Sequence, residues 1–153
     1  MKGTTISNMS DRTVASALPS RPLISVSPGD SVLHAATLMA GANCGSALVL
    51  VGEAIVGIVT ERDILIKVVA KAVDPAATSV DVVMTKKPVC AHHDMLVTHA
   101  LYTMWELGFR HMPVVDAERR AMGIFALRDA LPEELAGADS LTRRVVRLTE
   151  TLG

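Results

Sequence analysis

The sequence contains an internal duplication, which limits the folds that the chain can adopt. The segment GIVTERD, which begins at Gly57, returns as GIFALRD from Gly123, 66 residues further on. The same offset aligns Pro22 with Pro88, and an offset of 65 aligns His34 with His99. A repeat of this length predicts two copies of one structural unit. We expect a loose segment over residues 1–11, a first repeat over 12–79, a second over 80–138 and an amphipathic C-terminal helix over 139–153.

Each repeat is predicted to contain a helix, a strand, a helix, two strands and a helix. In the first copy, apolar spacing predicts a helix from residue 30 to 40, and the aliphatic run Ala47–Val51 is typical of a buried strand. A short turn at Gly52 joins it to a second strand, followed by a helix over 61–72. In the second copy the helix 96–107 should bury Leu96, Ala100 and Met104, and Trp105 is also expected in the core.

Composition narrows the functional classes. Half of the 153 residues are hydrophobic but only 3% are aromatic, so the core should be aliphatic. The formal net charge of -1 gives no basic surface for nucleic acid or an acidic membrane. No apolar run approaches the ~20 residues of a membrane span, and the first residues lack a secretory-signal pattern. We therefore expect a cytoplasmic protein with reduced thiols.

The duplicated pattern resembles the paired cystathionine-β-synthase-type (CBS) domain, or Bateman module, over residues 12–131. The resemblance rests on the doubled Gly-aliphatic-x-Thr-x-x-Asp pattern, on the segment 82–85 before Pro88, and on the segment 108–116. It implies an α+β fold in which each repeat forms a small three-stranded sheet with flanking helices. Two such sheets, too open to be stable alone, would pack with pseudo-twofold symmetry and leave two clefts between them.

The resemblance also implies which residues would bind a ligand. In the family, the motif Asp holds the ribose hydroxyls of an adenosyl compound, and a Thr or Ser hydroxyl assists. The candidate nucleotide-binding residues are Gly57, Ile58, Thr60, Asp63, Arg110, His111, Met112, Pro113, Arg128 and Asp129. No catalytic residues and no metal ligands are predicted. Arg128, on a first helical turn, is also consistent with a solvated position.

The two copies differ in ways that bear on the ligand. Thr60 and Asp63 complete the first motif, whereas the second keeps Asp129 but has Ala126 in place of the hydroxyl. Arg110 and His111 precede a strand of the second copy, where the first has Gly45 and Ser46. We therefore expect the cleft that pairs the first motif with Arg110 and His111 to be the better phosphate-bearing site, and the other to be weaker, empty or suited to a less charged ligand.

Structural explanations compete with these roles. Thr60 and Asp63 form a helix capping box in sequence. The second copy lacks the hydroxyl, which argues against capping as the explanation of both motifs. His92, His93 and Cys90 match no zinc spacing, and adjacent side chains of an extended segment should point to opposite faces.

The leading hypothesis is a non-catalytic sensor. It would bind AMP, ADP, ATP, NAD(H) or S-adenosylmethionine between its repeats, form a homodimer, need no cofactor and signal to a separate, unknown effector protein. The alternatives are a ligand-free dimerisation module and, third, a metal or redox sensor.

Overall fold

The computed structural model describes residues 12–130. Its helices are α1 (Val14–Ala17), α2 (Val32–Gly41), α3 (Glu61–Ile64), α4 (Val80–Val83) and α5 (Val97–Leu107). Its strands are β1 (Ser25–Val26), β2 (Ser46–Val51), β3 (Ala54–Thr60), β4 (Thr85–Lys86), β5 (Ala91–His92), β6 (His111–Val115) and β7 (Ala121–Ala126). A π-helical segment, Leu65–Val69, continues α3. The predicted C-terminal helix lies outside the described residues.

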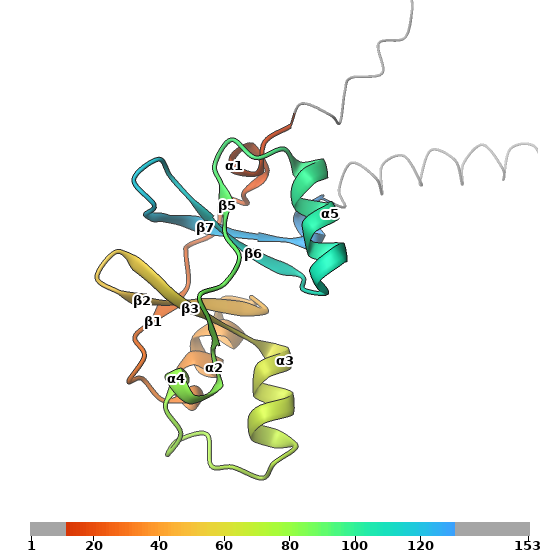
Figure 1. Cartoon of the computed structure of the whole chain (residues 1–153). Helices are drawn as coiled ribbons and strands as arrows, with labels where there is room; N and C mark the ends of the chain where they lie inside the picture. The colour runs from red at the N-terminus through yellow and green to blue at the C-terminus, as the bar shows by residue number, and fades with distance from the viewer. Residues whose placement is uncertain (1–11, 131–153) are drawn as a thin grey trace, which may run out of the picture.

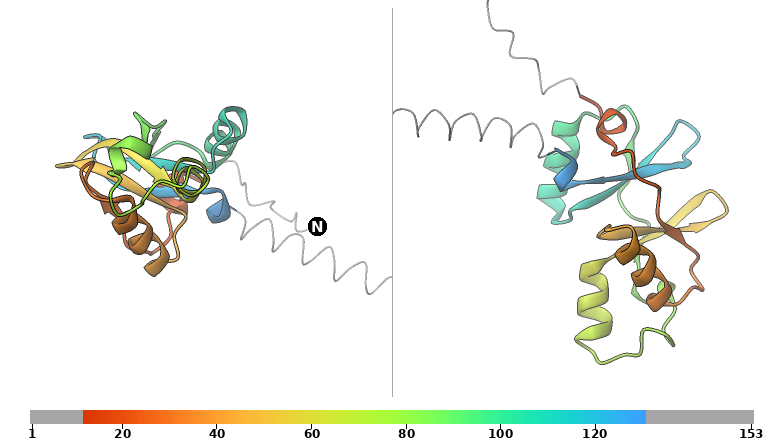
Figure 2. Two further views of the ribbon diagram at one scale, coloured as in Figure 1. Left: turned by 90° about the horizontal axis from the view of Figure 1, so that it is seen from below. Right: turned by 180° about the vertical axis from the view of Figure 1, so that it is seen from behind.

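The strands form two separate sheets, one in each repeat. In the first sheet the order is β1-β2-β3-β4, and in the second it is β5-β6-β7. Each begins with a parallel pair and continues with an antiparallel hairpin. Figures 1 and 2 show the two sheets next to each other in the middle of the molecule. The predicted α+β fold of two small sheets with flanking helices is confirmed.

The first sheet has one strand more than predicted, because the linker between the repeats pairs with it. In β4, Lys86 lies opposite Gly57 of β3. Gly57 permits this close approach, since a Cβ atom there would lie 2.5 Å from Sδ of Met84. The linker is therefore held against the first repeat before the chain reaches β5.

The leading helix of each repeat packs into the core of the other repeat. Val14 of α1 lies in one cluster with Ala91 and Phe125 of the second repeat. Val80 of α4 lies in the other cluster with Val59 of the first. The chain consequently crosses between the halves twice, once from α1 to β1 and once from β4 to β5 (Figure 1). The segment between α1 and β1 is called the first crossover below and comprises residues 18–24.

The inner faces of the sheets are buried by contact between the repeats. In β2, Ala47 and Val49 belong to the core of the first half, while Leu48 points to the other face and is also fully buried. Ile58 and Pro113 are likewise buried but belong to neither core cluster. Because strand residues alternate between faces, these side chains must be covered by the neighbouring repeat.

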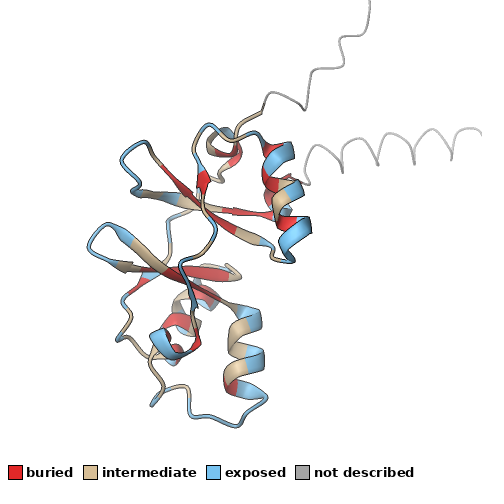
Figure 3. Cartoon of the chain, viewed as in Figure 1, coloured by how far each residue is buried: buried red, intermediate tan, exposed pale blue. Residues whose placement is uncertain are grey.

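Several predictions of burial were wrong. Trp105 is 83% exposed and so belongs to the residues of α5 that are pale blue in Figure 3. In the same helix Val97, rather than Leu96, joins Ala100 and Met104 in the core. In the segment that continues α3, Leu65 and Val69 are exposed and Val68 is buried.

Candidate functional site

Two adjoining pockets lie between the repeats, on the side of the second motif. The first encloses about 500 Å³ when space open to solvent is counted. Both pockets include Gly45 from the first repeat and His111, Ala126 and Arg128 from the second. The first also includes the first crossover, and the second includes Arg110 and Glu61. Together they form one cleft with walls from both halves.

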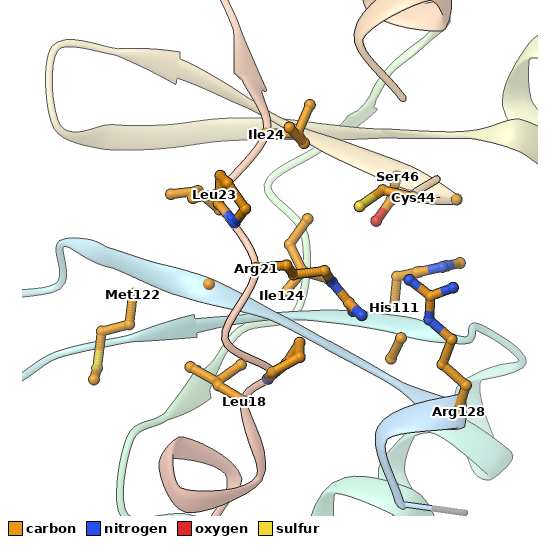
Figure 4. A pocket seen from close by; sticks show the side chains of 15 residues that line it. Leu18, Arg21, Leu23, Ile24, Cys44, Ser46, His111, Met122, Ile124 and Arg128 are labelled. Atoms are coloured by element: carbon orange, nitrogen blue, oxygen red, sulfur yellow. The ribbon is translucent and has the colours of Figure 1, made fainter. Parts of the chain in front are cut away.

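Three basic side chains meet in this cleft. Figure 4 shows Arg21 from the first crossover, His111 from the start of β6 and Arg128 from the helical turn after β7, with their polar ends directed toward one another. Arg128 also donates to the backbone carbonyl of Asn43 at 3.3 Å, which links the two repeats. Such a group of donors suits an anionic ligand.

His111 is largely enclosed, and its surroundings set its charge. Burial is the main cause that lowers its pKa below the usual 6.5, and Arg128 and Arg21 lower it further, while Glu61 and Asp129 raise it. Gly45 makes the enclosure tight, because a Cβ atom there would lie 3.1 Å from Nε2 of His111 and 3.3 Å from the Glu61 carboxyl.

Asp129, at the end of the second motif, is joined to the first crossover. Arg21 donates from one guanidinium nitrogen to both carboxylate oxygens, at 3.3 Å and 3.2 Å. The backbone N–H of Ala126 donates to the same carboxylate at 2.7 Å. The Asp129 side chain is 6% exposed and that of Arg21 29% exposed. An ion pair that spans 108 residues of sequence therefore joins Asp129 to Arg21, which lines the first pocket.

The first motif has a different environment. Thr60 and Asp63 form a complete capping box at the start of α3. Lys67, one helical turn further on, donates to the Asp63 carboxylate at 2.8 Å and to the backbone carbonyl of Val83 at 2.7 Å. Thr60 and Asp63 line neither of the two pockets, and the same is true of Asp129. The first motif contributes Glu61 to the lining, and the second contributes Ala126 and Arg128.

The predicted site residues thus fall into two groups. The structure brings Arg110, His111 and Arg128 together, with Asp129 beside them through Arg21. Met112 is part of the second core, whereas Gly57, Ile58 and Pro113 serve packing as described above. The predicted pairing of Thr60 and Asp63 with Arg110 and His111 is not present in these pockets.

Sequence reasoning missed Arg21 and Glu61. Arg21 precedes Pro22, which the duplication aligns with Pro88, so its counterpart is Lys87. That repeated basic-Pro pair was the available signal. The argument against capping was also wrong, because Asp129 accepts the Ala126 N–H without any hydroxyl at that position.

Two neighbouring histidines, His92 and His93, were considered above as candidate metal ligands. The rings of His92 and His93 lie 4.4 Å apart, so the expectation that they point to opposite faces was wrong. Nevertheless, within residues 12–130 no three His, Cys, Asp or Glu side chains are grouped so as to hold a metal ion. Burial raises the pKa of Cys90, which keeps its thiol protonated and less reactive.

Comparison with known proteins places the chain in a family. The model of the CBS domain matches it twice, at residues 14–70 and 79–134. The chain belongs to the CBS-domain family. It is 38% identical over 96 residues to a CBS domain-containing protein of Arabidopsis thaliana, covering 63% of this chain and 17% of that protein. The chain thus spans less than a fifth of that relative's length.

Solved structures with the same fold include complexes with adenosyl compounds. A CBS domain protein from Pyrobaculum aerophilum complexed with AMP is 25% identical, with a TM-score of 0.73 over 82% of this chain and 99% of that one. The CBS domain pair of the protein MJ0100, in complex with 5′-methylthioadenosine and S-adenosyl-L-methionine, is 28% identical, with a TM-score of 0.71 over 84% and 98%. None of the helices between residues 12 and 130 has the length and apolar character needed to cross a bilayer.

Proposed function

We propose that this CBS pair is a non-catalytic regulatory module that binds an adenosyl nucleotide in the cleft beside the second motif. The observation that carries the proposal is the convergence of Arg21, His111 and Arg128 next to the Asp129 carboxylate. A carboxylate can accept both ribose hydroxyls, as acidic residues do in dinucleotide-binding folds. The basic groups then lie where a ligand's phosphate can accept their hydrogen bonds.

The cleft couples ligand binding to the arrangement of the repeats. Its walls come from both halves, and Arg21 lies on the first crossover. A ligand that binds one arrangement of the repeats more tightly than another will shift the population toward it. We propose that a separate effector protein responds to this shift, and that the site of the first motif binds a second ligand more weakly.

The exposed apolar side chains provide a surface for protein partners. They lie on two helical regions: Leu65, Ile66 and Val69 after α3, and Tyr102, Trp105 and Leu107 on α5. Apolar groups of this size on a small protein favour association. We propose a homodimer through these helices, with the effector protein as a further partner.

A ligand-free interaction module is the second candidate. It is favoured by the fact that both motif carboxylates already have partners, Lys67 for Asp63 and Arg21 for Asp129. Within the described residues, every buried side-chain nitrogen or oxygen atom has a hydrogen-bond partner. Such a module would dimerise through the same helices whether or not a nucleotide is present.

Calorimetric titration separates the two candidates. Protein stripped of co-purified ligand would be titrated with AMP, ADP, ATP, NAD(H) and S-adenosylmethionine, with GMP and inorganic phosphate as controls. A sensor binds at least one adenosyl compound and binds the controls more weakly. If no adenosyl compound binds, the nucleotide-sensor proposal fails and the interaction module takes its place.

A further inference from the structure

The Arg21–Asp129 ion pair covers the carboxylate to which the proposed function assigns the ribose hydroxyls. Arg21 holds both oxygens of the Asp129 carboxylate, and Ala126 N–H takes one of the remaining acceptor positions. The carboxylate is nearly inaccessible to water while this ion pair is in place. Ribose hydroxyls can therefore bind Asp129 only when the guanidinium moves aside.

Moving Arg21 aside costs more for some ligands than for others. Breaking a largely buried ion pair leaves an uncompensated charge, which is strongly unfavourable. The displaced guanidinium would also remain in a cleft that contains Arg128 and His111 (Figure 4). A ligand with an uncharged 5′ group offers the displaced guanidinium no new anionic partner. A phosphate group offers bidentate, charge-assisted hydrogen bonds.

The first crossover keeps Arg21 near the ligand after the ion pair opens. Pro19 and Pro22 flank it and fix the backbone φ angles on either side. The residues from Leu18 to Ile24, apart from Ser20, line the same cleft. Both ends of the segment are anchored, by α1 in the second core and by β1 in the first sheet. The guanidinium can thus turn from the carboxylate to a neighbouring phosphate without a large change of backbone.

We infer that Arg21 is a specificity-determining residue that makes this cleft favour adenosyl ligands carrying a 5′-phosphate over adenosyl ligands with an uncharged 5′ group. The inference rests on the proposed function. It adds that the ligand changes the partners of both residues. The Asp129 carboxylate would accept hydrogen bonds from the ribose hydroxyls in place of Arg21, and the Arg21 guanidinium would pair with the phosphate in place of Asp129.

The test compares AMP with 5′-methylthioadenosine, since these differ in the charge of the 5′ group. Calorimetry would give the affinity of each for wild-type protein and for Arg21→Gln. The wild type should bind AMP at least about tenfold more tightly, the effect expected of one charge-assisted contact. In Arg21→Gln the AMP affinity should fall about tenfold while that of 5′-methylthioadenosine is unchanged or higher, so that the preference disappears.

Two further variants control for folding and for general charge. Arg21→Lys keeps the cation and should retain part of the preference. Arg120→Gln removes an exposed arginine that pairs with Asp116 in the β6–β7 turn, and should leave both affinities unchanged. Thermal unfolding establishes that each variant is folded.

The outcomes distinguish this inference from the proposed function. If the wild type binds neither compound nor any other adenosyl ligand, the proposed function itself fails. If it binds AMP and 5′-methylthioadenosine equally, or if Arg21→Gln keeps the wild-type preference, the role of Arg21 is refuted while nucleotide binding stands.

Discussion

The two copies of the motif use their aspartates in different ways. Asp63 pairs with Lys67, four residues away, and caps its own helix. Asp129 caps its helix too, but its ion-pair partner is Arg21, on the first crossover. The first arrangement stabilises one helix start, whereas the second ties together segments from opposite ends of the chain. A duplicated sequence can thus place one residue type in a local role and in a long-range role, and Asp129 has the long-range one through its pair with the first crossover.

The largest expected effect is on stability when each aspartate is truncated. Asp129→Ala leaves Arg21 without its carboxylate and the buried Ala126 N–H without an acceptor, and should lower the free energy of unfolding by about 3 kcal/mol. Asp63→Ala removes half of a capping box and a partly exposed ion pair, and should cost about 1–2 kcal/mol. Urea unfolding measures both. Equal losses would contradict the distinction between the local and the long-range aspartate.

Removing the basic partner of each aspartate should also affect stability to different extents. Arg21→Gln should lower the free energy of unfolding by about 1–2 kcal/mol, because it leaves a nearly buried carboxylate unpaired. Lys67→Gln should cost about 0.5 kcal/mol, since the Lys67 side chain is 38% exposed. A double-mutant cycle between Arg21 and Asp129 should show coupling larger than that between Lys67 and Asp63. Coupling that is larger for the local pair would overturn the ranking.

The pH dependence of stability tests the enclosure of His111. Burial holds its pKa in the folded protein below the 6.5 of an exposed histidine. Its contribution to stability is therefore fully present above pH 6.5 and is lost as the pH falls through the folded-state pKa. Thermal unfolding between pH 7.5 and 5 should show a steeper loss for the wild type than for His111→Gln. His99→Gln, at an exposed position of α5, is the matched control. If His111→Gln loses stability with falling pH as steeply as the wild type, His111 is not the source of this pH dependence.

The smallest effect concerns the wall of the cleft opposite His111. A methyl group at Gly45 would press on His111 and Glu61, so Gly45→Ala should cost about 0.5–1 kcal/mol. Gly41, at the end of α2, has nothing within 4 Å of its added Cβ, and Gly41→Ala should be neutral or stabilising by a few tenths of a kcal/mol. Urea unfolding of the pair would show whether the contact is tight. If Gly45→Ala stabilised the protein, the side chains of His111 and Glu61 would have to move aside without cost.

Much of the fold could be predicted because it depends on local patterns. The repeat, the aliphatic strands β2 and β3 and the hairpin turns followed from apolar runs and turn residues. The exchange of leading helices could not be predicted, since Val14 and Val80 are equally apolar wherever they pack. Trp105 was misplaced for a similar reason, because helical spacing alone does not show that a face is left uncovered.

The candidate site was only partly accessible to sequence reasoning. Arg110, His111 and Arg128 were identified and do lie together. The partner of Asp129 was missed because an ion pair between residues 21 and 129 leaves no trace in local spacing. The capping role of Asp63 was visible as a sequence pattern. That of Asp129 was not, because position 126 is an alanine, which lacks the hydroxyl of a capping box, although its backbone N–H still donates to Asp129.

We propose that the second motif, rather than the first, holds the nucleotide. The most direct measurement is a calorimetric titration of AMP into Asp63→Asn and Asp129→Asn side by side, since asparagine preserves the side-chain shape. We expect Asp129→Asn to weaken AMP binding by about tenfold or more and Asp63→Asn to change it by less than about threefold. Loss of AMP binding in Asp63→Asn with wild-type affinity in Asp129→Asn would place the nucleotide at the first motif and contradict this account.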